Sequence, residues 1–431
     1  MSGPVTTEQG WLRLHPLTPL LRSGRFAVAI LALVTQQGVQ QRPPVLVVLT
    51  FLVGVVSLAL LFGYLSWRAT RYRLADGELQ VDSGVVQRRT RRVPIVRLQS
   101  VDVVRPLLAR ALGLAELRLE VAGGGDTEAP LSYLSEDDAH RLRSRLLALS
   151  AGSSAGSELD EVSPEEELLV QVPTRALVVS VLLGAPALVG AGLLVGLVVL
   201  LVVAPGAAPA VLAVMLTAAI GTVSAVVRRL LNEYGFSVAE SADGLRLRHG
   251  LLETRAQTIP TGRVQTVRLT EPLLWRRRGW VRVEVDVAGY GAGGQEQEVT
   301  AALLPVAPRA FALALVDRVL GAAVPPADRP APPAARWRAP LSARLLAVGV
   351  DDRHLVATSG VLTRTTDVLP LAKVQSLRLV QGPWQRRLGL ASVHADSAGR
   401  RLSGAVARHR DTHEAEALLA DLTRRARLAR R

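Results

Sequence analysis

The sequence contains no cysteine, which excludes a disulfide framework, a thiolate metal site and a cysteine nucleophile. Aromatic residues make up only 4% of the 431 residues, and Lys373 is the one lysine among 51 basic residues. So strong a preference for arginine is typical of a GC-rich coding bias, and a single arginine is therefore no evidence for phosphate binding. The low hydrophobicity of disordered chains is also absent, because 49% of the residues are apolar.

Charged residues are missing from three long apolar runs, although 20% of the chain is charged and the mean hydropathy is +0.27. The runs 45–66, 176–203 and 207–227 all reach the roughly 20 residues that a membrane-spanning helix needs. They are apolar on every face, whereas a helix at the surface of a soluble core keeps a polar face. A fourth run, 26–39, is shorter, and we expect a short span there, with a cleaved signal peptide as the alternative.

Basic residues are distributed unevenly around these runs. The short loops that join the runs in pairs carry one basic residue, Arg42, whereas the outer ends carry eight. The positive-inside rule therefore predicts two transmembrane hairpins whose outer ends, together with every large polar region, face the cytoplasm. No ionisable residue lies within the three long runs, which disfavours a pump built from this chain alone but leaves a scramblase-like or partner-dependent pore open. The eight outer basic residues are Arg22, Arg25, Arg68, Arg71, Arg73, Arg175, Arg228 and Arg229.

Three segments of the chain share one set of landmarks at constant offsets, which indicates an internal repeat. Each segment has a glycine, then an apolar residue with proline, then a basic-apolar-Gln-Ser/Thr-apolar run, and later a second glycine. The second segment follows the first by 166 residues and the third follows it by 276, with no gap across 40 positions. We assign a structural role to these landmarks. They are Gly84, Pro94, Gln99 and Gly113, then Gly250, Pro260, Gln265 and Gly279, then Gly360, Pro370, Gln375 and Gly389.

The repeated segments alternate apolar and polar residues, which predicts mainly β-strands. Asp76-Gly77 and Asp243-Gly244 are typical of tight hairpin turns between two such strands. An amphipathic helix is expected at the end of each segment, over 135–149, 307–320 and 413–428, and the first of these begins with Ser135 as its cap. Each segment therefore predicts a small curved antiparallel sheet capped by a C-terminal helix.

On these landmarks the chain resembles the bacterial pleckstrin-homology (PH)-like domain family of the YdbT/YdbS type. The resemblance implies three α+β modules, each a barrel-like sheet closed by a helix, with paired membrane spans between modules. It departs from the family pattern at 278–280, which reads Arg-Gly-Trp instead of Leu-Gly-Leu, and at 382–383, where the proline is shifted by one position. It implies no enzymatic activity. It implies a shorter one-module relative as a partner, in envelope defence or in the transport of toxic peptides.

The expected fold class is a membrane protein with two transmembrane helical hairpins, four α-helices in all, and three PH-like α+β modules. We expect it in the cell membrane as a multi-pass protein with its modules facing the cytoplasm. Eight regions follow along the chain. They are a cytoplasmic N-terminal segment (1–25), hairpin 1 (26–67), module 1 (68–150), an acidic Ser/Gly linker (151–173), hairpin 2 (174–229), module 2 (230–321), a Pro/Ala-rich linker (322–346) and module 3 with a basic tail (347–431).

Basic residues beside apolar or tryptophan side chains are typical of a membrane headgroup interface. Each one near an anionic surface contributes about 1 kcal/mol to binding. The alternative is a solvated arginine face beside a Pro/Leu turn that packs into the module core. We expect anionic lipid or a partner protein to bind at eleven positions. They are Arg88, Arg97, Arg110, Arg255, Arg263, Trp275, Arg276, Arg364, Lys373, Trp384 and Arg386.

No arrangement of residues indicates catalysis, so we expect no enzyme, no metal and no cofactor. His409 and His413 have the spacing of a helical metal pair but lack a third ligand, and a helix start explains them better. The glycine-rich run 288–294 lies between two expected strands, whereas a phosphate-binding loop opens a helix. The basic tail 424–431 has no aromatic platform, so we expect no nucleic acid, and no small-molecule substrate is inferred.

We therefore expect a non-catalytic integral membrane protein whose modules form an assembly platform for proteins or lipids. The expected partners are anionic inner-leaflet lipids and a membrane protein with a related module, or a second copy of the chain. One alternative is a component of a lipid or peptide translocation complex. The other is a membrane enzyme, for which Glu233, Tyr234 and His249 are the nearest polar candidates.

Overall fold

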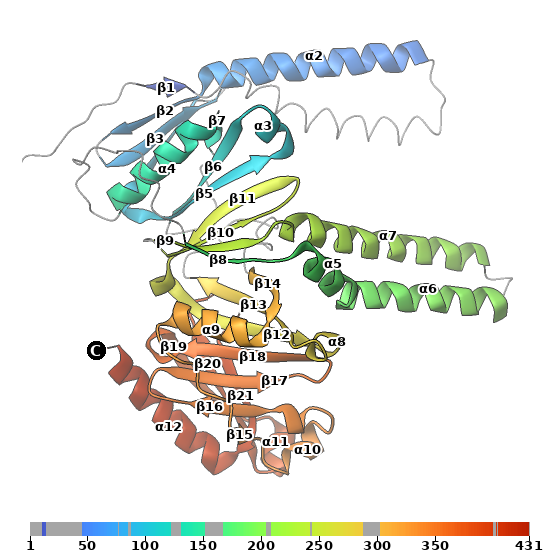
Figure 1. Cartoon of the computed structure of the whole chain (residues 1–431), viewed down its shortest axis with the longest axis vertical. Coiled ribbons are helices and arrows are strands. Elements are labelled where there is room, and N and C mark those ends of the chain that lie inside the picture. The colour runs from blue at the N-terminus through green and yellow to red at the C-terminus, as the bar shows by residue number, and fades with distance from the viewer. Residues whose placement is uncertain are drawn as a thin grey trace, which may run out of the picture. The chain divides into compact units, whose positions relative to one another are not determined.

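Two units, each with a hydrophobic core of its own, make up the chain in the computed structural model. Unit 1 contains Met1–Val162 and Glu253–Gln257, and unit 2 contains Ser163–Leu252 and Thr258–Arg431. Figure 1 labels the elements of both, and each unit is described by itself. The structure describes residues 11–13, 45–75, 77–84, 88–121, 131–150, 167–203, 208–241, 244–287, 302–399, 402 and 404–430.

Unit 1 combines one long apolar helix with two antiparallel groups of strands and a capping helix. The first four strands follow one another in a sheet, and the amphipathic helix α4 packs against the strands that come after them. Leu117 and Leu146 are completely buried between α4 and these strands. The elements are β1 (Leu12–Arg13), α2 (Val45–Ala69), β2 (Arg71–Ala75), β3 (Glu78–Ser83), β4 (Arg89–Pro94), η1 (Ile95–Arg97), β5 (Leu98–Pro106), α3 (Leu107–Ala111), β6 (Leu114–Val121), β7 (Leu131–Ser135) and α4 (Glu136–Ser150).

Unit 2 begins with one strand and three helices and then continues with the strands of modules 2 and 3. Both amphipathic helices of these modules, α9 and α12, pack on the strands just before them. Its elements up to module 2 are β8 (Glu167–Gln171), α5 (Thr174–Leu182), α6 (Ala185–Val203), α7 (Ala208–Glu233), β9 (Ser237–Ser241), β10 (Gly244–His249), the end of β11 (Glu253–Ile259, of which Glu253–Gln257 belongs to unit 1), η3 (Thr261–Arg263), β12 (Val264–Pro272), α8 (Leu273–Arg276), β13 (Trp280–Val287), β14 (Ala302–Pro308) and α9 (Arg309–Leu320).

Module 3 completes unit 2 and shares a sheet with module 2. Seven strands form this sheet in the order β14-β13-β12-β18-β17-β16-β15, and β19-β20-β21 form a separate sheet. Its elements are β15 (Arg329–Pro330), α10 (Ala335–Arg338), η5 (Ala343–Leu345), β16 (Ala347–Val350), β17 (His354–Ser359), β18 (Thr363–Pro370), η6 (Leu371–Lys373), β19 (Val374–Val380), α11 (Pro383–Arg387), β20 (Leu390–Ser397), β21 (Ala405–Asp411) and α12 (Thr412–Ala429).

The landmark glycines of the three modules all adopt backbone angles that side chains rarely tolerate. At Gly360, whose φ is +97°, an added Cβ would lie 1.9 Å from the carbonyl oxygen of Thr363. A larger residue would therefore break this turn, which explains why glycine stands there. The φ angles are 112°, 105° and 97° at Gly84, Gly250 and Gly360, and 66°, 63° and 64° at Gly113, Gly279 and Gly389.

The other landmarks also shape local turns. Pro260 and Pro370 each precede a short 3-10 helix, η3 and η6, with extended backbone angles. The expected cap of the first amphipathic helix is confirmed, because the Ser135 hydroxyl accepts a hydrogen bond from the amide of Asp138 at 3.1 Å. Gln265 is buried and donates to the carbonyl of Arg263 at 3.1 Å. These residues fix where each strand ends and the next begins.

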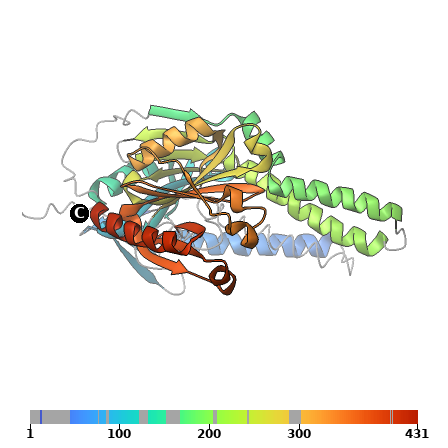
Figure 2. The same ribbon diagram turned by 90° about the horizontal axis from the view of Figure 1, so that it is seen from below.

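The expectation of two transmembrane hairpins made of four helices is wrong. Among the residues whose side chains are described, one helical stretch, Val214–Glu233 of α7, is long and apolar enough to cross a membrane. The pair α5 and α6 gives a second at most, because a bend of 47° separates the two helices. Figures 1 and 2 show α6 and α7 extending side by side away from the sheets of unit 2. The short span expected at 26–39 lies outside the described residues.

The bend has a physical cause in the sequence of the second apolar run. The helix is interrupted at Leu183 and Gly184, and α6 restarts with Pro186 in its first turn, where proline is tolerated. The part before the bend, α5, packs into the core of unit 2 through Leu177 and Val181, which are both 2% exposed. Apolar content along this run therefore reflects burial in protein for α5 rather than contact with lipid.

Candidate functional site

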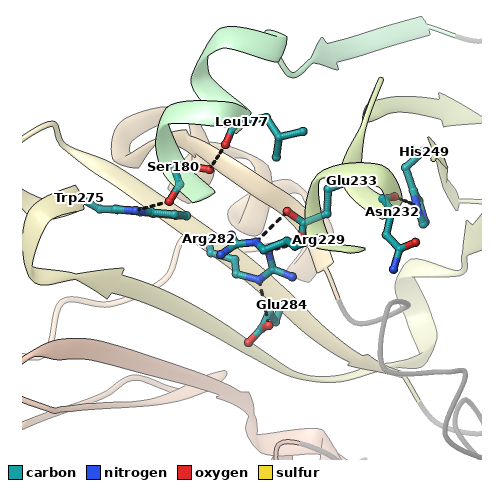
Figure 3. Close-up of polar contacts among 9 residues, drawn as sticks. All are labelled: Leu177, Ser180, Arg229, Asn232, Glu233, His249, Trp275, Arg282 and Glu284. Carbon is teal, nitrogen blue, oxygen red and sulfur yellow. Dashed lines mark hydrogen bonds and ion pairs between the residues drawn. The ribbon is translucent and has the colours of Figure 1, made fainter. Parts of the chain in front are cut away.

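The end of α7 meets module 2 in a cluster of buried charges (Figure 3). Glu233 is 5% exposed and accepts from two arginines, Arg229 Nε at 3.1 Å and Arg282 Nη1 at 2.6 Å. Arg282 Nε also donates to Glu284 at 3.0 Å. Burial alone would lower the pKa of Arg282, but the charges of Glu233 and Glu284 raise it above the ordinary value. The cluster is therefore a neutral set of two cations and two anions.

Trp275 closes the same region from the side of α5. Its ring is 1% exposed, its Nε1 donates to the carbonyl of Ser180 at 3.0 Å, and the guanidinium of Arg229 lies 5.6 Å from the ring centre. The Ser180 hydroxyl in turn donates to the carbonyl of Leu177 at 2.7 Å (Figure 3). Trp275 thus belongs to the core, and we remove it from the candidate headgroup positions.

Two of the three polar residues considered for a membrane enzyme, Glu233 and His249, are buried and engaged in polar contacts. His249 is 4% exposed, its Nδ1 lies 2.7 Å from the carbonyl oxygen of Asn232, and its ring stacks on Phe236 with centroids 5.3 Å apart. Tyr234 is 40% exposed at the turn after α7. Glu233 is held by two arginines, so it lacks the free access that a general base needs. The geometry fits a rigid attachment of helix to module.

Exposed apolar side chains gather at one tip of unit 2. Leu273 at the start of α8 is 49% exposed, and Leu362 in the turn between β17 and β18 is 73% exposed. Arg276 binds this turn, because its Nη2 donates to the carbonyls of Val361 and Leu362. Figure 1 shows α8 at the side of unit 2 from which α6 and α7 extend. The structure therefore brings Leu273, Arg276 and Leu362 together, and sequence analysis had not connected them.

Two further tips carry the same combination of apolar and basic side chains. In module 3, Trp384 is 65% exposed, the guanidinium of Arg387 lies 5.7 Å from its ring centre, and Arg386 is exposed beside it. In unit 1, Leu107 and Leu108 of α3 are 46% and 65% exposed. Arg110 of the same helix is exposed and donates to the hydroxyl of Thr254 at 3.1 Å. The packed Pro/Leu turn that the sequence left open as an alternative is not what these two leucines form.

The remaining basic candidates are spread over the modules rather than gathered in one patch. In unit 1, Arg88 pairs with Asp82 at 2.8 Å and Arg255 donates to Glu253 at 3.0 Å. The side chain of Arg97 lies outside the described set. In unit 2, Arg263 is exposed and Arg364 half-buried, and Lys373 donates to the carbonyl of Gly262 at 2.8 Å.

A partly buried ion pair joins module 2 to module 3 inside their shared sheet. Arg268 on β12 stands opposite Asp367 on β18 and binds it through two hydrogen bonds of 2.6 and 3.2 Å. Burial raises the pKa of Asp367 above its ordinary value of 3.8, although Arg268 and Arg408 act in the other direction. Sequence analysis missed this pair, because the contact depends on strand pairing between residues that lie 99 positions apart. The sole available hint was an acidic residue, Asp367, within a run of mostly neutral residues.

The described residues contain no group of three or more histidine, aspartate or glutamate side chains placed to hold a metal ion. His409 lies 2.9 Å from Gln385 through its Nδ1, and burial together with Arg338 and Arg408 lowers its pKa. His413 lies in the first turn of α12, where its amide donates to the capping carboxylate of Asp411 at 3.0 Å. The helix-start interpretation of this histidine pair therefore fits the structure.

Comparisons with known proteins find one family and one relative. The bacterial PH domain family matches residues 26–150, 170–323 and 310–426. The chain is 26% identical over 285 residues to the UPF0699 transmembrane protein YdbT of Bacillus subtilis (strain 168). This match covers 59% of the chain and 58% of that protein, less than two thirds of its length. No solved structure matches the chain. The family resemblance inferred from the repeated landmarks is confirmed.

Proposed function

Because the chain belongs to the bacterial PH domain family, we propose that it is a non-catalytic membrane protein whose modules recognise the inner surface of the cell membrane. The similar Bacillus protein is a transmembrane protein, which supports a membrane location for this chain as well. The apolar helix α7, joined to module 2 through Glu233, would hold the modules beside the lipid. The arginines at the outer ends of the apolar runs favour the cytoplasmic side.

The observation that carries this proposal is the exposed tip of unit 2. Leu273 and Leu362 present apolar surface at the tip that contains α8, and α8 lies at the side of unit 2 from which α6 and α7 extend (Figure 1). An anchored module would bring that surface to the headgroup region. Arg277 and Arg278 are exposed beside them, and the guanidinium of Arg278 stacks 5.2 Å from the ring centre of Trp280. Apolar side chains flanked by cations suit an anionic lipid surface, where each cation contributes about 1 kcal/mol.

The absence of cysteine allows a direct test in the full chain. A single cysteine at Leu273 (L273C) carries a nitroxide label, and the chain is placed in nanodiscs that contain anionic phosphatidylglycerol. We expect the label to be accessible to oxygen and shielded from a water-soluble nickel reagent, as in the headgroup region. The matched control is A417C on the exposed face of α12, where the label should stay accessible to nickel. Equal nickel accessibility at both positions would refute the proposed contact.

The charge contribution is tested separately. Changing Arg277 and Arg278 to glutamate should reduce the shielding of the L273C label in anionic nanodiscs and leave it unchanged in neutral phosphatidylcholine nanodiscs. The reason is that the cations contribute only where the surface is negative. The orientation is tested in cells, where a membrane-impermeant maleimide should label A417C only after the cytoplasmic membrane has been opened. Labelling of intact cells with a permeable outer envelope would place the modules on the other side.

A further inference from the structure

The strand pairings that join consecutive modules share one register. In unit 2, β12 pairs with β18, and Pro272 stands opposite Thr363. In unit 1, Pro106 of β5 stands opposite Glu253. This is the equivalent pair one module earlier, because Pro106 precedes Pro272 by 166 residues and Glu253 precedes Thr363 by 110, which are the offsets of the repeat. In both cases, the strand that follows the landmark proline of one module, β5 or β12, pairs along its edge with a strand of the next module, β11 or β18. The edge is therefore a repeated binding surface for an antiparallel strand.

The equivalent strand of module 3 is β19, which follows β12 by 110 residues, and it ends its sheet. The order of that sheet is β19-β20-β21, so no strand of the described part of the chain pairs with the outer edge of β19. The effect on side chains is direct. Leu269 of β12 is 2% exposed, whereas the equivalent Leu379 is half-buried, and Val380 beside it is 41% exposed. An edge with unpaired backbone groups and apolar side chains is a template for another strand.

The charge at this edge also lacks the partner that its equivalent has. Arg268 of β12 binds Asp367 on the neighbouring strand. Arg378 is its equivalent on β19 and binds Asp396 of its own module, at 2.9 and 3.0 Å. The pair on β19 lies at the surface, and the arginine there is 58% exposed. An incoming acidic residue would find Arg378 at the position that Asp367 recognises in β12.

We propose that the outer edge of β19 binds an antiparallel β-strand of a separate protein that carries an acidic side chain opposite Arg378. This is recognition by strand addition, in which backbone hydrogen bonds give affinity and one cross-strand ion pair fixes the register. The proposal goes beyond lipid contact and does not depend on it. The strand that comes from a related module would repeat the two joins already present in the chain.

A second copy of this chain does not fit the edge in that register. The strand of module 1 equivalent to β18 is β4, and Arg91 of β4 is equivalent to Asp367. Pairing β4 with β19 would therefore place Arg91 opposite Arg378 and Arg89 opposite Val380. Like charges directly opposite each other destabilise an antiparallel pair. The exposed arginines of β4 thus disfavour a head-to-tail pairing of β4 with β19.

Disulfide trapping tests the proposal, because the chain has no cysteine of its own. The full chain with V380C, in detergent without lipid, is mixed with a synthetic peptide of the sequence Thr363–Pro370 that carries T365C. The shared register places these two cysteines opposite each other, since Thr365 stands opposite Thr270 in the join between modules 2 and 3. We expect trapping well above that of two controls, the A417C chain and a peptide with V368C instead of T365C. Trapping equal to the controls would overturn the proposal.

The charge pair is tested with the same reagents. A peptide with D367R should be trapped about fivefold less by the V380C chain, and adding R378E to the chain should reverse this order. The peptide variant leaves the protein unaltered, so the result does not depend on whether R378E folds. If neither change affected the amount of disulfide adduct, recognition of an acidic strand would be contradicted. A disulfide dimer between V380C and R89C chains, formed as readily as the peptide adduct, would instead identify a second copy as the partner.

Discussion

Modules 2 and 3 differ most where module 2 contacts something outside itself. In module 2, Trp275 and Arg282 pack against the helices, with Glu233 between them (Figure 3). The equivalent residues of module 3 lie 110 positions later, with Gln385 in place of Trp275, Ser392 in place of Arg282 and Ala343 in place of Glu233. Gln385 Nε2 donates to Ser392 Oγ at 2.9 Å, a neutral contact in place of an ion pair. The same place in the fold thus carries charges where a long apolar helix must be fixed, and neutral groups where the described residues just before the module, 321–346, contain no such helix.

The second difference lies at the sheet edge. β12 is covered by β18, and the first four side chains of β12 are all buried. In β19, by contrast, one side chain is buried, that of Val374. The arginine on each strand accordingly pairs with a neighbouring module in one case and with its own module in the other. Equivalent residues therefore contribute differently to stability, depending on what covers them. This gives three ways to test the comparison.

The largest effect is expected for Glu233→Gln. The substitution leaves Arg229 and Arg282 without the carboxylate that lies between them, and breaking a buried pair in this way costs about 3–5 kcal/mol. For a unit of this size, each kcal/mol lowers the unfolding temperature by roughly 2–4 °C. Circular dichroism of the detergent-solubilised chain measures the shift.

The matched control for this change is Glu240→Gln on β9 of the same module. Glu240 pairs with Arg318, but the two side chains are 38% and 52% exposed, and such surface pairs contribute about 0–1 kcal/mol. A shift for Glu233→Gln no larger than that of the control would show that the cluster does not fix the helix. The comparison between charged and neutral junctions would then lose its physical basis.

An intermediate effect is expected for Leu269→Ala on the covered strand. Its side chain is 2% exposed within the core of unit 2, so its loss should cost about 2–3 kcal/mol. The equivalent Leu379→Ala on β19 should cost less than half of this, because that side chain is already partly exposed to water. Thermal unfolding of the two variants side by side measures the ratio. Equal losses would mean that β19 is as well covered as β12.

The sequence predicted what depends on neighbouring residues. Gly84, Gly250 and Gly360 stand at positive φ angles, and Ser135 caps its helix, because turn and cap geometry is set within a few positions. Trp275 and Trp384 were treated as equivalent, but by the 110-residue offset the residue equivalent to Trp275 is Gln385, which directly follows Trp384. One position along a short helix therefore separates a buried ring from an exposed one.

What depends on distant residues was not predictable in the same way. The helix break at Leu183 and Gly184 interrupts a run that is apolar throughout, because composition alone does not distinguish burial in protein from burial in lipid. The pairing of Arg268 with Asp367 needs the strand order of a sheet shared by two modules. Its position in the sequence gives no sign of which strand will cover which edge.

The smallest effect expected is a difference in pH dependence between the two acidic residues. Burial raises the pKa of Asp367 above 3.8, whereas the hydrogen bond from Arg378 lowers that of Asp396 below it. A raised pKa gives stability that is present below 3.8 and lost as the pH rises through the folded-state value. A lowered pKa gives stability that is present above 3.8 and lost as the pH falls through the folded-state value.

These opposite signs can be read from two Asn variants. Between about pH 3 and pH 7, the unfolding temperature of the natural chain should fall relative to D367N and rise relative to D396N as the pH increases. Each variant removes one titrating carboxyl and serves as the control for the other. If both differences moved in the same direction, burial in the join between β12 and β18 would not be what distinguishes Asp367 from Asp396. When the peptide of residues 363–370 is bound to β19, Arg378 also binds the acidic residue of the peptide and interacts less strongly with Asp396. The pH-dependent difference in unfolding temperature between the natural chain and D396N should then become smaller.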